Sequence, residues 1–310
     1  MNILIGSNGG LTGIYLAKKY KEMESVFIIG ADSSADSTGR FFVDKQVIMP
    51  PANDKMFVDE LIKILNENEI DVYLPTHSKE IRIVSLYSDR IQSETSAKFL
   101  VSPIKTFNDL ENKSVANRNL SDAGIPVPKR IDDFESGYPI IMKKNIGSGS
   151  SGTIIIDNPQ IHKAYLSSVE NVDFYELIIG KEYTLDCMFG AYGELIGFNQ
   201  RQRVKTIGGA VSITKNYVGF DIAPWIHKIA SKWKFCGCVN FQYIVRDNIP
   251  YFIDVNLRYP SGGLPLTVES GLNVPQLIIS ILNNEPVESF VLPDQNKELT
   301  MYRYFEEIFC

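Results

Sequence analysis

The sequence predicts an α/β protein in which an open parallel sheet precedes a second, larger domain. At 310 residues, the chain is long enough for two or three packed domains. Short apolar segments alternate with amphipathic ones over residues 1–102, which is the pattern of strands and helices around a parallel sheet. Residues 238–263 have the pattern of two strands joined by a short turn, with polar side chains along one face.

The first domain is predicted from its hydrophobic periodicity. We expect strands at residues 2–5, 26–30 and 71–75, and helices at residues 14–22, 57–67 and 80–88. The turn after the first strand contains Gly6, Gly9, Gly10 and Gly13, a spacing that differs from the G-x-G-x-x-G of dinucleotide sites. Asp32 follows the second strand, where a ribose ligand would lie, so an NAD-dependent enzyme stays an alternative with weak support.

The segment after the third predicted strand carries candidates for a substrate rim. Open sheets bind ligands at the carboxyl ends of their strands, and His77 and Glu80 lie just beyond such an end. The alternative for His77 is a residue at a helix start whose ring bonds to the backbone, and this alternative is favoured.

Composition excludes several classes of function. The formal net charge of −6 argues against a general nucleic-acid binder, which would carry a basic surface. No apolar run approaches the roughly 18 residues that span a bilayer. Cys236 and Cys238 have no second pair at zinc-ligand spacing, so we expect them to be buried as small apolar side chains. The first ten residues predict a strand and a glycine turn instead of a signal peptide, so we expect a cytoplasmic protein that binds neither nucleic acid nor membrane.

The second domain is expected to begin near residue 103. A helix from residue 113 to about residue 124 is followed by strands at 138–143 and 153–156. Between these strands lies the sequence GSGSSG, residues 147–152. Its backbone N–H groups and serine hydroxyls could wrap a triphosphate beside Lys143, although it is not a Walker A loop. The alternative is a Gly/Ser linker, and the tight bracketing by two strands favours the phosphate loop.

Three cations alternate along a strand predicted at residues 199–205. Arg201, Arg203 and Lys205 therefore share one face. Like charges so aligned repel each other unless an anion lies among them, which indicates a triphosphate or an acidic substrate. The alternative is an exposed edge strand that its charges protect from aggregation, and the sequence does not decide between the two. Helices at 223–234 and 275–283 and a strand at 300–305 complete the chain.

The predicted hairpin places oxygen-bearing side chains on one face. Phe252, Asp254, Asn256 and Arg258 alternate with apolar neighbours, so we expect these four to share a face. The strand therefore has one apolar face and one polar face, and the polar face ends in a cation.

The register of this hairpin would bring metal ligands together. A loop over residues 247–249 sets Gln242 opposite Asp254 and Asn240 opposite Asn256. Three side-chain oxygens on neighbouring strands suit a hard cation such as Mg²⁺. From spacing alone, a hairpin whose polar face meets water is an equal alternative. Arg258 and the Pro-Ser-Gly-Gly sequence shift the balance to a ligand site, because a fixed charge and free backbone amides bind anions.

The sequence FIDVNLRYPSGG, residues 252–263, resembles the metal-binding end of ATP-grasp enzymes, especially the large chain of carbamoyl phosphate synthetase and its single-copy relatives. The resemblance implies that Gln242, Asp254 and Asn256 hold Mg²⁺ or Mn²⁺ and that Arg258 is catalytic. Asp254 stands where the family more often has glutamate, which is one methylene longer.

Three further segments resemble the family in the same order. Residues 112–128 are similar to its DK…GIPVP segment, with Asn112 in place of the aspartate. Residues 143–152 resemble its phosphate loop, although Lys144 stands where a proline is usual. Residues 174–186 resemble the hinge that clamps ATP between two lobes. The implied ATP ligands are, at the phosphates, Lys113, Lys143, Ser148, Gly149, Ser150 and Ser151, and at the adenosine, Glu176, Leu177, Ile178 and Glu182.

The resemblance implies a Rossmann-like pre-ATP-grasp domain at 1–102 and an ATP-grasp domain at 103–310. The latter would divide into a small ATP-clamping lobe, about 120–177, and a large lobe, about 178–310. The implied activity is that of a carbon–nitrogen ligase, which joins a carboxylate to an amine through an acyl phosphate and releases ADP and phosphate. An amino acid or another small carboxylate is the expected substrate, and a homodimer is expected. The implied substrate ligands are His77, Glu80, Arg201 and Arg203.

Two alternatives to the ligase activity remain at this point, besides an NAD-dependent enzyme. The first is another outcome of carboxylate activation, such as carboxylation. The second is a non-catalytic protein that ATP regulates. Complete carbamoyl phosphate synthesis is disfavoured, because the family's large chain needs two ATP-grasp halves and this chain has one.

Overall fold

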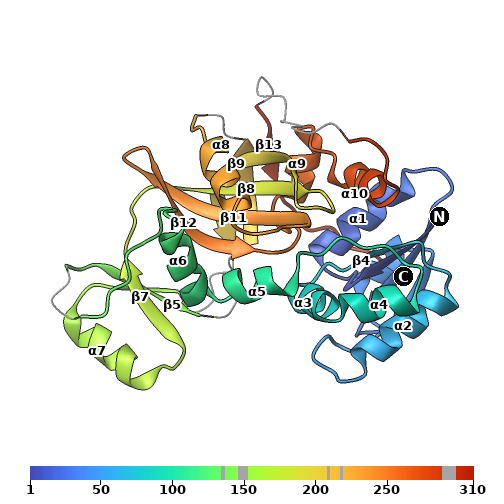
Figure 1. Cartoon of the computed structure of the whole chain (residues 1–310), viewed down its shortest axis with the longest axis horizontal. Coiled ribbons are helices and arrows are strands. Elements are labelled where there is room, and N and C mark those ends of the chain that lie inside the picture. The colour runs from blue at the N-terminus through green and yellow to red at the C-terminus, as the bar shows by residue number, and fades with distance from the viewer. Residues whose placement is uncertain (134–136, 146–152, 208–209, 217–218, 288–297) are drawn as a thin grey trace.

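A computed structural model describes residues 1–133, 137–145, 153–207, 210–216, 219–287 and 298–310. The described strands form three sheets, with four, six and three strands. In Figure 1, the four-stranded sheet lies at the N-terminal end of the molecule, the six-stranded sheet in the middle, and the three-stranded sheet in a lobe at the far side.

The N-terminal sheet is parallel and has the order β3-β2-β1-β4. Its strands are β1 (Asn2–Gly6), β2 (Phe27–Asp32), β3 (Lys45–Ile48) and β4 (Val72–Leu74). Its helices are α1 (Leu11–Lys21), η1 (Thr38–Phe42), α2 (Phe57–Glu67), α3 (Ser78–Leu86) and α4 (Ser88–Glu94). Alternate residues of β1 enter different cores: Ile3 and Ile5 pack with Leu16 on one face, and Leu4 packs on the other. The predicted open parallel sheet is confirmed.

The glycine turn after β1 is closed by its own residues. Gly9 donates its N–H to Asp32 Oδ2 at 3.1 Å, and the Ser37 hydroxyl donates to the same oxygen at 3.2 Å. A Cβ on Gly13 would lie 2.5 Å from the Cα of Asn8, so helix α1 can pack this closely only with glycine there. The Asp32 carboxylate therefore holds the turn together.

The six-stranded sheet is antiparallel and has the order β12-β11-β8-β9-β10-β13. Its strands are β8 (Lys181–Phe189), β9 (Leu195–Ile207), β10 (Ala210–Asn216), β11 (Gly237–Arg246), β12 (Ile249–Asn256) and β13 (Thr300–Tyr302). One face packs on α5 (Ile104–Leu110), α6 (Lys113–Asp122) and α8 (Ala223–Ala230) around a core rich in aromatic side chains. The predicted helix at 223–234 thus ends four residues early, and the predicted strand at 300–305 ends at Tyr302.

The other face of this sheet has an apolar part and a polar part. Toward the N-terminal domain it is apolar, and Met188, Ile196 and Cys238 pack in one core with α1 and with α9 (Leu264–Glu269) and α10 (Val274–Leu282). Tyr20 of α1 ties the two domains further, because its hydroxyl donates to the carbonyl of Pro275 at 3.1 Å. Away from that domain the same face becomes polar.

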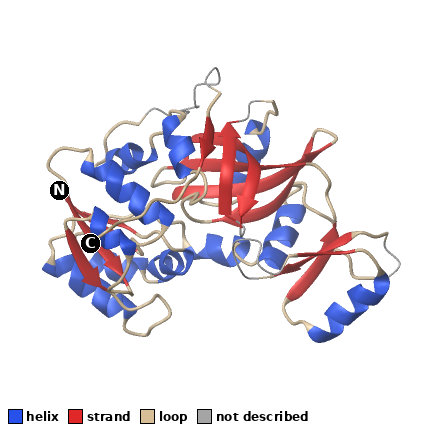
Figure 2. Ribbon diagram, turned by 180° about the vertical axis from the view of Figure 1, so that it is seen from behind, coloured by secondary structure: helices blue, strands red, loops and turns tan. Residues whose placement is uncertain are grey.

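The three-stranded sheet has the order β6-β5-β7 and is antiparallel. It consists of β5 (Ile140–Lys144), β6 (Ile154–Ile156) and β7 (Val172–Glu176), with α7 (Pro159–Ser168) packed over it. Figure 2 shows this small sheet standing apart from the six-stranded sheet.

The hairpin β11–β12 has the predicted pairing but not the predicted turn. Gln242 pairs with Asp254, as predicted, yet the turn contains only Asp247 and Asn248, both with positive φ (52° and 60°). A β-bulge after Gln242 shifts the register by one residue and recovers the predicted pairs.

The bulge also turns the side chain of Phe252 to the face opposite the predicted one. Phe252 is 1% exposed and packs in the aromatic core with Val255 and Leu257, whereas Ile253 and Asp254 both line a cavity on the opposite face. The prediction that Phe252 shares a face with Asp254 is therefore wrong.

Candidate functional site

A cavity of about 370 Å³ lies between the three-stranded sheet and the polar part of the six-stranded sheet. It is lined by residues from both, together with the start of α6 and the loop after β12. Of the sequence-predicted site residues, it brings together Lys113, Lys143, Glu176, Leu177, Ile178, Glu182, Arg201, Arg203, Gln242, Asp254, Asn256 and Arg258. Ser148, Gly149, Ser150 and Ser151 lie outside the described residues.

Strand register aligns the polar side chains of the six-stranded sheet in two rows. In one row, Asp254 pairs with Gln242, which pairs with Thr184, which pairs with Arg201. In the next row, Asn256, Asn240, Asp186 and Asn199 follow one another across the same four strands. Because side chains alternate along each strand, both rows face the cavity side of the sheet.

The candidate metal ligands form a short chain of contacts. Asp254 Oδ1 accepts a hydrogen bond from the Lys113 ammonium at 2.8 Å, and its Oδ2 accepts one from Asn256 Nδ2 at 3.3 Å. Asn256 Oδ1 in turn accepts from Arg258 Nη2 at 3.3 Å. Among the described residues, no group of three His, Cys, Asp or Glu side chains could cage a metal ion. One carboxylate with two amides nevertheless fits Mg²⁺, which in nucleotide sites completes its shell with phosphates and water.

Lys143 projects into the cavity from β5, and the adjacent Lys144 is exposed. Burial lowers the pKa of the Lys143 ammonium; Asp254 and Glu182 act against this change, whereas Lys113 adds to it. Two lysines from different elements thus converge beside one aspartate, which is a suitable arrangement for the negative charge of phosphate groups.

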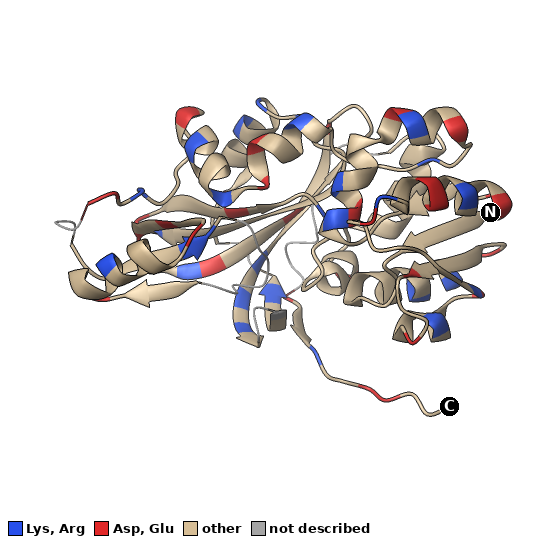
Figure 3. Ribbon diagram, turned by 90° about the horizontal axis from the view of Figure 1, so that it is seen from below, with Lys and Arg blue, Asp and Glu red and all other residues tan. Residues whose placement is uncertain are grey.

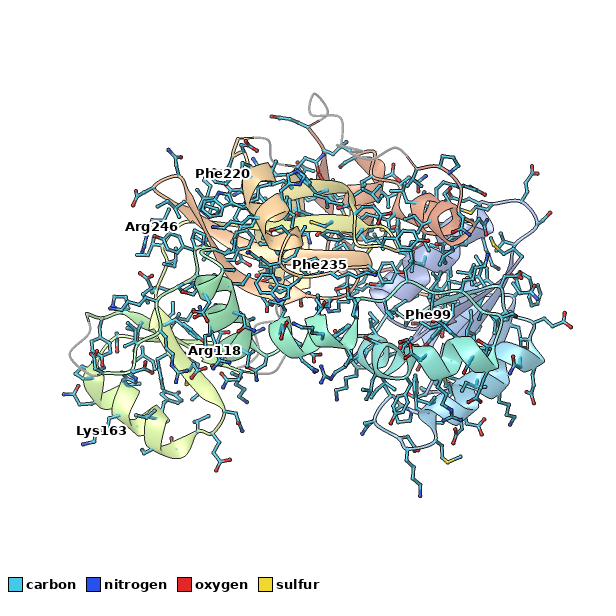
Figure 4. All side chains as sticks on the ribbon, viewed as in Figure 1. Phe99, Arg118, Lys163, Phe220, Phe235 and Arg246 are labelled. Atoms are coloured by element: carbon cyan, nitrogen blue, oxygen red, sulfur yellow. The ribbon has the colours of Figure 1, made fainter. Side chains whose placement is uncertain are left out.

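The hinge between the lobes is held by Glu176 at the end of β7. Its Oε1 accepts from the backbone N–H of Lys129 at 2.9 Å, and its Oε2 lies 3.4 Å from the Nη atoms of Arg246. Figure 4 labels Arg246 at the outer end of the β11–β12 hairpin. Leu177 and Ile178 follow and line the cavity with apolar surface. The Glu176 side chain therefore ties both lobes together at this point.

The arginines of β9 are paired with carboxylates of the neighbouring strand. Arg201 is buried and bonds to Asp186 through Nε and Nη2 at 2.8 and 3.2 Å. Arg203 Nε lies 2.8 Å from Glu182 Oε1. β9 lies between β8 and β10, so the alternative of a charged edge strand is wrong. The repulsion between the arginines is offset by acidic residues of β8.

A second cavity of about 520 Å³ lies against the N-terminal domain. Leu11, Arg258 and Ser261 line both cavities, so the two adjoin. His77 lines the second one, and its Nδ1 accepts the N–H of Lys79 at 3.3 Å as the N-cap of α3. The favoured alternative for His77 is therefore confirmed. Burial lowers the pKa of His77, and the charges of Lys79 and Arg258 lower it further.

Glu80 is deeply buried at the same end of the sheet. Its carboxylate accepts hydrogen bonds from the hydroxyls of Tyr73 (2.6 Å) and Ser7 (2.9 Å), and from the N–H groups of Thr76 and His77 (both 3.3 Å). Burial raises the pKa of Glu80, and these hydrogen bonds act against that change. Glu80 thus joins β1, β4 and α3, and its role as a substrate ligand stays a prediction.

Asn240 has the predicted position opposite Asn256, although the sequence assigned it no role; it lines the cavity and donates to the carbonyl of Arg258 at 3.0 Å. Two other residues of this region were missed from the sequence. Asp186 is the buried ion-pair partner of Arg201. The alternation of side chains along residues 181–189 could have placed it on the same face as Glu182. Arg303, just after β13, donates to the carbonyls of Ser261 and Gly262 at 3.3 and 3.4 Å. For Arg303 the sequence holds no local signal, because the contact spans about 40 residues of chain.

Two family models match the chain. Residues 174–304 match the model described as "ATP-grasp in the biosynthetic pathway with Ter operon". Residues 3–97 match the model described as "PylC-like, N-terminal domain". Among curated proteins, the chain is 20% identical over 264 residues to the carbamoyl phosphate synthase large chain of Sulfurisphaera tokodaii, which covers 77% of this chain. The match takes in only 25% of that relative's length.

Solved structures share the fold over nearly the whole chain. N5-carboxyaminoimidazole synthetase from Staphylococcus aureus, complexed with ADP, has a TM-score of 0.76 at 17% identity and covers 98% of this chain and 82% of its own. The biotin carboxylase domain of Hydrogenobacter thermophilus 2-oxoglutarate carboxylase, in complex with MgADP and bicarbonate, has a TM-score of 0.73 at 15% identity (92% and 70% covered). L-amino acid ligase from Bacillus licheniformis has a TM-score of 0.69 at 15% identity (93% and 75% covered).

The comparisons confirm the predicted fold class and the resemblance on which the predicted site rests. The predicted cofactors, ATP with Mg²⁺ or Mn²⁺, agree with the ADP and Mg²⁺ named for the neighbours. Among the described residues, no helix has the length and apolar character needed to cross a membrane.

Proposed function

We propose that this chain, which carries an ATP-grasp domain behind a PylC-like N-terminal domain, is an ADP-forming ligase that joins a small carboxylate to an amine. The observation that carries the proposal is the convergence on one cavity of Lys113 and Lys143, the metal-ligand trio around Asp254, and Arg258. These groups come from both lobes and could surround the phosphates of one nucleotide.

ATP would lie between the lobes. Leu177 and Ile178 offer apolar surface and backbone groups for adenine at the hinge, and Glu182 offers a carboxylate for the ribose hydroxyls. Lys143 and Lys113 would bind the phosphates. Lys113 pairs with Asp254 in this structure, so nucleotide binding would exchange that carboxylate for a phosphate oxygen.

Gln242, Asp254 and Asn256 would hold Mg²⁺ or Mn²⁺, which when bound would neutralise part of the charge on the phosphates. The pairing across β11 and β12 brings these side chains to one wall of the cavity. Arg258 Nη2 already bonds to Asn256 Oδ1, so it orients the amide oxygen of this set.

The reaction begins with a poor electrophile. A carboxylate oxygen would attack the γ-phosphorus of ATP while the bond to ADP breaks, which leaves an acyl phosphate. The lone pair of the amine would then attack the carbonyl carbon, and phosphate would leave with the C–O bonding electrons while the amine loses a proton. Arg258, whose pKa is lowered by burial, stays cationic and would stabilise the negative charge on the tetrahedral oxygen. Positioning of the two substrates would supply much of the remaining rate.

The substrates would enter from the adjoining cavities. Arg201 and Arg203 line the first cavity, and His77 and Glu80 line the second, where a small carboxylate or amino acid would fit beside Arg258.

We also propose residues 1–102 and 103–310 as the two domains, a cytoplasmic location and a homodimer. The free, buried thiols of Cys187, Cys236 and Cys238 support a reducing compartment.

The test measures ADP and phosphate release from Mg-ATP with pooled amino acids and small carboxylates, in the presence and absence of bicarbonate. We expect release that depends on an added carboxylate and amine, and we expect Asp254→Ala to abolish it with an unchanged far-UV circular dichroism spectrum. Near-normal turnover by Asp254→Ala would contradict the metal site. Formation of AMP and pyrophosphate would refute the acyl phosphate, and release driven by bicarbonate alone would indicate a carboxylase.

A further inference from the structure

Two arginine side chains beside the first cavity have buried N–H groups without a described partner. Arg201 uses Nε and Nη2 to bond Asp186, and its Nη1 is buried with no hydrogen-bond partner among the described residues. The same holds for Nη1 of Arg303, whose Nη2 bonds to two carbonyls of the loop after β12. A buried donor without a partner has lost its hydrogen bonds to water and gained none in return, and native structures retain few such groups.

The charge at this place is not balanced by the described carboxylates. Asp186 neutralises Arg201, whereas Arg303 forms no ion pair with a described carboxylate. Burial lowers the pKa of the Arg303 guanidinium, and the charge of Arg201 lowers it further, so the two guanidinium groups repel each other. An anion between them would offset this repulsion.

The arginines surround the loop of residues 259–263. Arg258 Nη1 donates to the Ser261 hydroxyl at 3.3 Å, and Arg303 holds the carbonyls of Ser261 and Gly262. On the other side, a Cβ on Gly263 would lie 2.0 Å from Nε of Arg201, so the loop packs against this arginine only because residue 263 lacks a side chain. Arg201 from β9, Arg258 just after β12 and Arg303 just after β13 thus contact one loop, whose Ser261 and Gly262 line the cavity.

We propose that Arg201 and Arg303 bind an anionic group of the substrate other than the carboxylate that ATP activates. The substrate then carries at least two oxyanion groups, as a dicarboxylate or a phosphorylated acid does; this inference rests on the proposed ligase function. The second anion supplies acceptors for both Nη1 atoms and the missing counter-charge for Arg303. Because both Nη1 atoms are buried in this structure, binding of the second anion would require Ser261 and Gly262 to move.

The spacing across the sheet separates this subsite from the activated carboxylate. Asp186, which holds Arg201, pairs with Asn240, and Asn240 pairs with Asn256. Two strand spacings, about 10 Å, therefore separate the counter-ion of Arg201 from Asp254 and Asn256, the candidate metal ligands on β12. One carboxylate is too small to reach both places, and a substrate with two anionic groups on a short carbon chain spans them.

The experiment is isothermal titration of the whole chain with Mg²⁺ and a non-hydrolysable ATP analogue bound, so that the phosphate sites of the nucleotide are filled. The probes are succinate, glutarate and inorganic phosphate, with butyrate as the monocarboxylate control. We expect at least one of the three anionic probes to bind saturably, and its identity distinguishes carboxylate from phosphate recognition. We expect Arg303→Gln to weaken that binding at least tenfold and Arg303→Lys to weaken it less.

The matched control is Arg90→Gln, which removes one positive charge at an exposed position in the N-terminal domain and leaves the binding unchanged. The inference is overturned if none of the three probes binds saturably, or if Arg303→Gln binds them as the unaltered chain does. Equal weakening of butyrate would assign Arg303 to the activated carboxylate, and weakening of the ATP analogue would assign it to the nucleotide. Since the titration needs no turnover, its result is separate from that of the ADP-release assay.

Discussion

The ion pair between Asp186 and Arg201 joins two buried charges, and we expect its loss to be costly. The side chains of Asp186 and Arg201 are 2% and 3% exposed, and hydrogen bonds of 2.8 and 3.2 Å join them. The Thr267 hydroxyl donates to the same carboxylate at 2.6 Å. Asp186→Asn keeps the shape of the side chain but leaves the guanidinium charge buried without its counter-ion. Breaking a buried pair in this way lowers the free energy of unfolding by about 3–5 kcal/mol.

The ion pair between Asp59 and Arg90 is the control. It has the same N–O distance as the pair between Asp186 and Arg201, but its side chains are exposed. The distance is 2.8 Å, and the side chains of Arg90 and Asp59 are 44% and 49% exposed. We therefore expect Asp59→Asn to lower the free energy of unfolding far less than Asp186→Asn does, because water screens an exposed pair.

Urea unfolding followed by far-UV circular dichroism, to which the helices of both domains contribute, measures both variants. The fluorescence of the two tryptophans, Trp225 and Trp233, which pack against the core of the six-stranded sheet, reports in addition on the domain that contains Asp186. The reasoning would be refuted if Asp186→Asn lost as little free energy of unfolding as Asp59→Asn, with an unchanged m-value (the slope of that free energy with urea concentration). Asp186→Leu combined with Arg201→Met removes both charges, and we expect it to recover most of the lost stability.

Two further predictions concern the cavity. Burial holds the pKa of the Lys143 ammonium below its usual 10.5, so we expect the affinity for MgADP to fall as the pH rises toward 10.5, because this ammonium loses its proton before an exposed lysine would. Lys143→Arg stays charged and should abolish the fall in calorimetric titrations; an identical fall in that variant would assign it to another group. Gly263→Ala should displace Arg201 and cost about 1–3 kcal/mol in urea unfolding, because its Cβ would lie 2.0 Å from Arg201 Nε. Gly262→Ala, whose Cβ would lie 3.3 Å from that of Val211, is the matched control, and equal losses in the two variants would contradict the prediction.

Local patterns in the sequence predicted the elements that depend on neighbouring residues. The helix predicted at 57–67 has the observed bounds of α2, because its apolar residues recur at helical spacing and pack on one face of the sheet. The elements that were not predicted include β3, η1, α4, α5, α7, β10 and α9, which are four to ten residues long, and short segments hold too few residues to establish a period.

The hairpin shows how local reasoning reached the right pairs through a wrong turn. A three-residue loop at 247–249 and a two-residue turn with a bulge place Gln242 and Asp254 opposite each other equally well. The two differ only in where Phe252 points. That choice depends on the aromatic core, in which Phe252 packs against Phe241 and Tyr243 from the neighbouring strand.

The end of the chain shows what no local pattern predicts. Residues after β13 leave the body of the molecule, as Figure 3 shows, with Phe305 and Phe309 both 93% exposed. Yet Arg303, at the start of this segment, is partly buried and reaches the loop after β12. The position of Arg303 follows from the pairing of β13 with β10 at the far edge of the sheet.

The sequence by itself determined which residue types the site contains and which of them share a strand face, since alternation along a strand is a local property. The tertiary structure alone decided which charges meet. Lys113 and Asp254 are 141 residues apart in the chain and 2.8 Å apart in the fold, and Arg201 finds its counter-ion on another strand. These pairs depend on the order of strands in the six-stranded sheet and on how α6 packs against β12, and both are set by burial of apolar surface remote from the charges themselves.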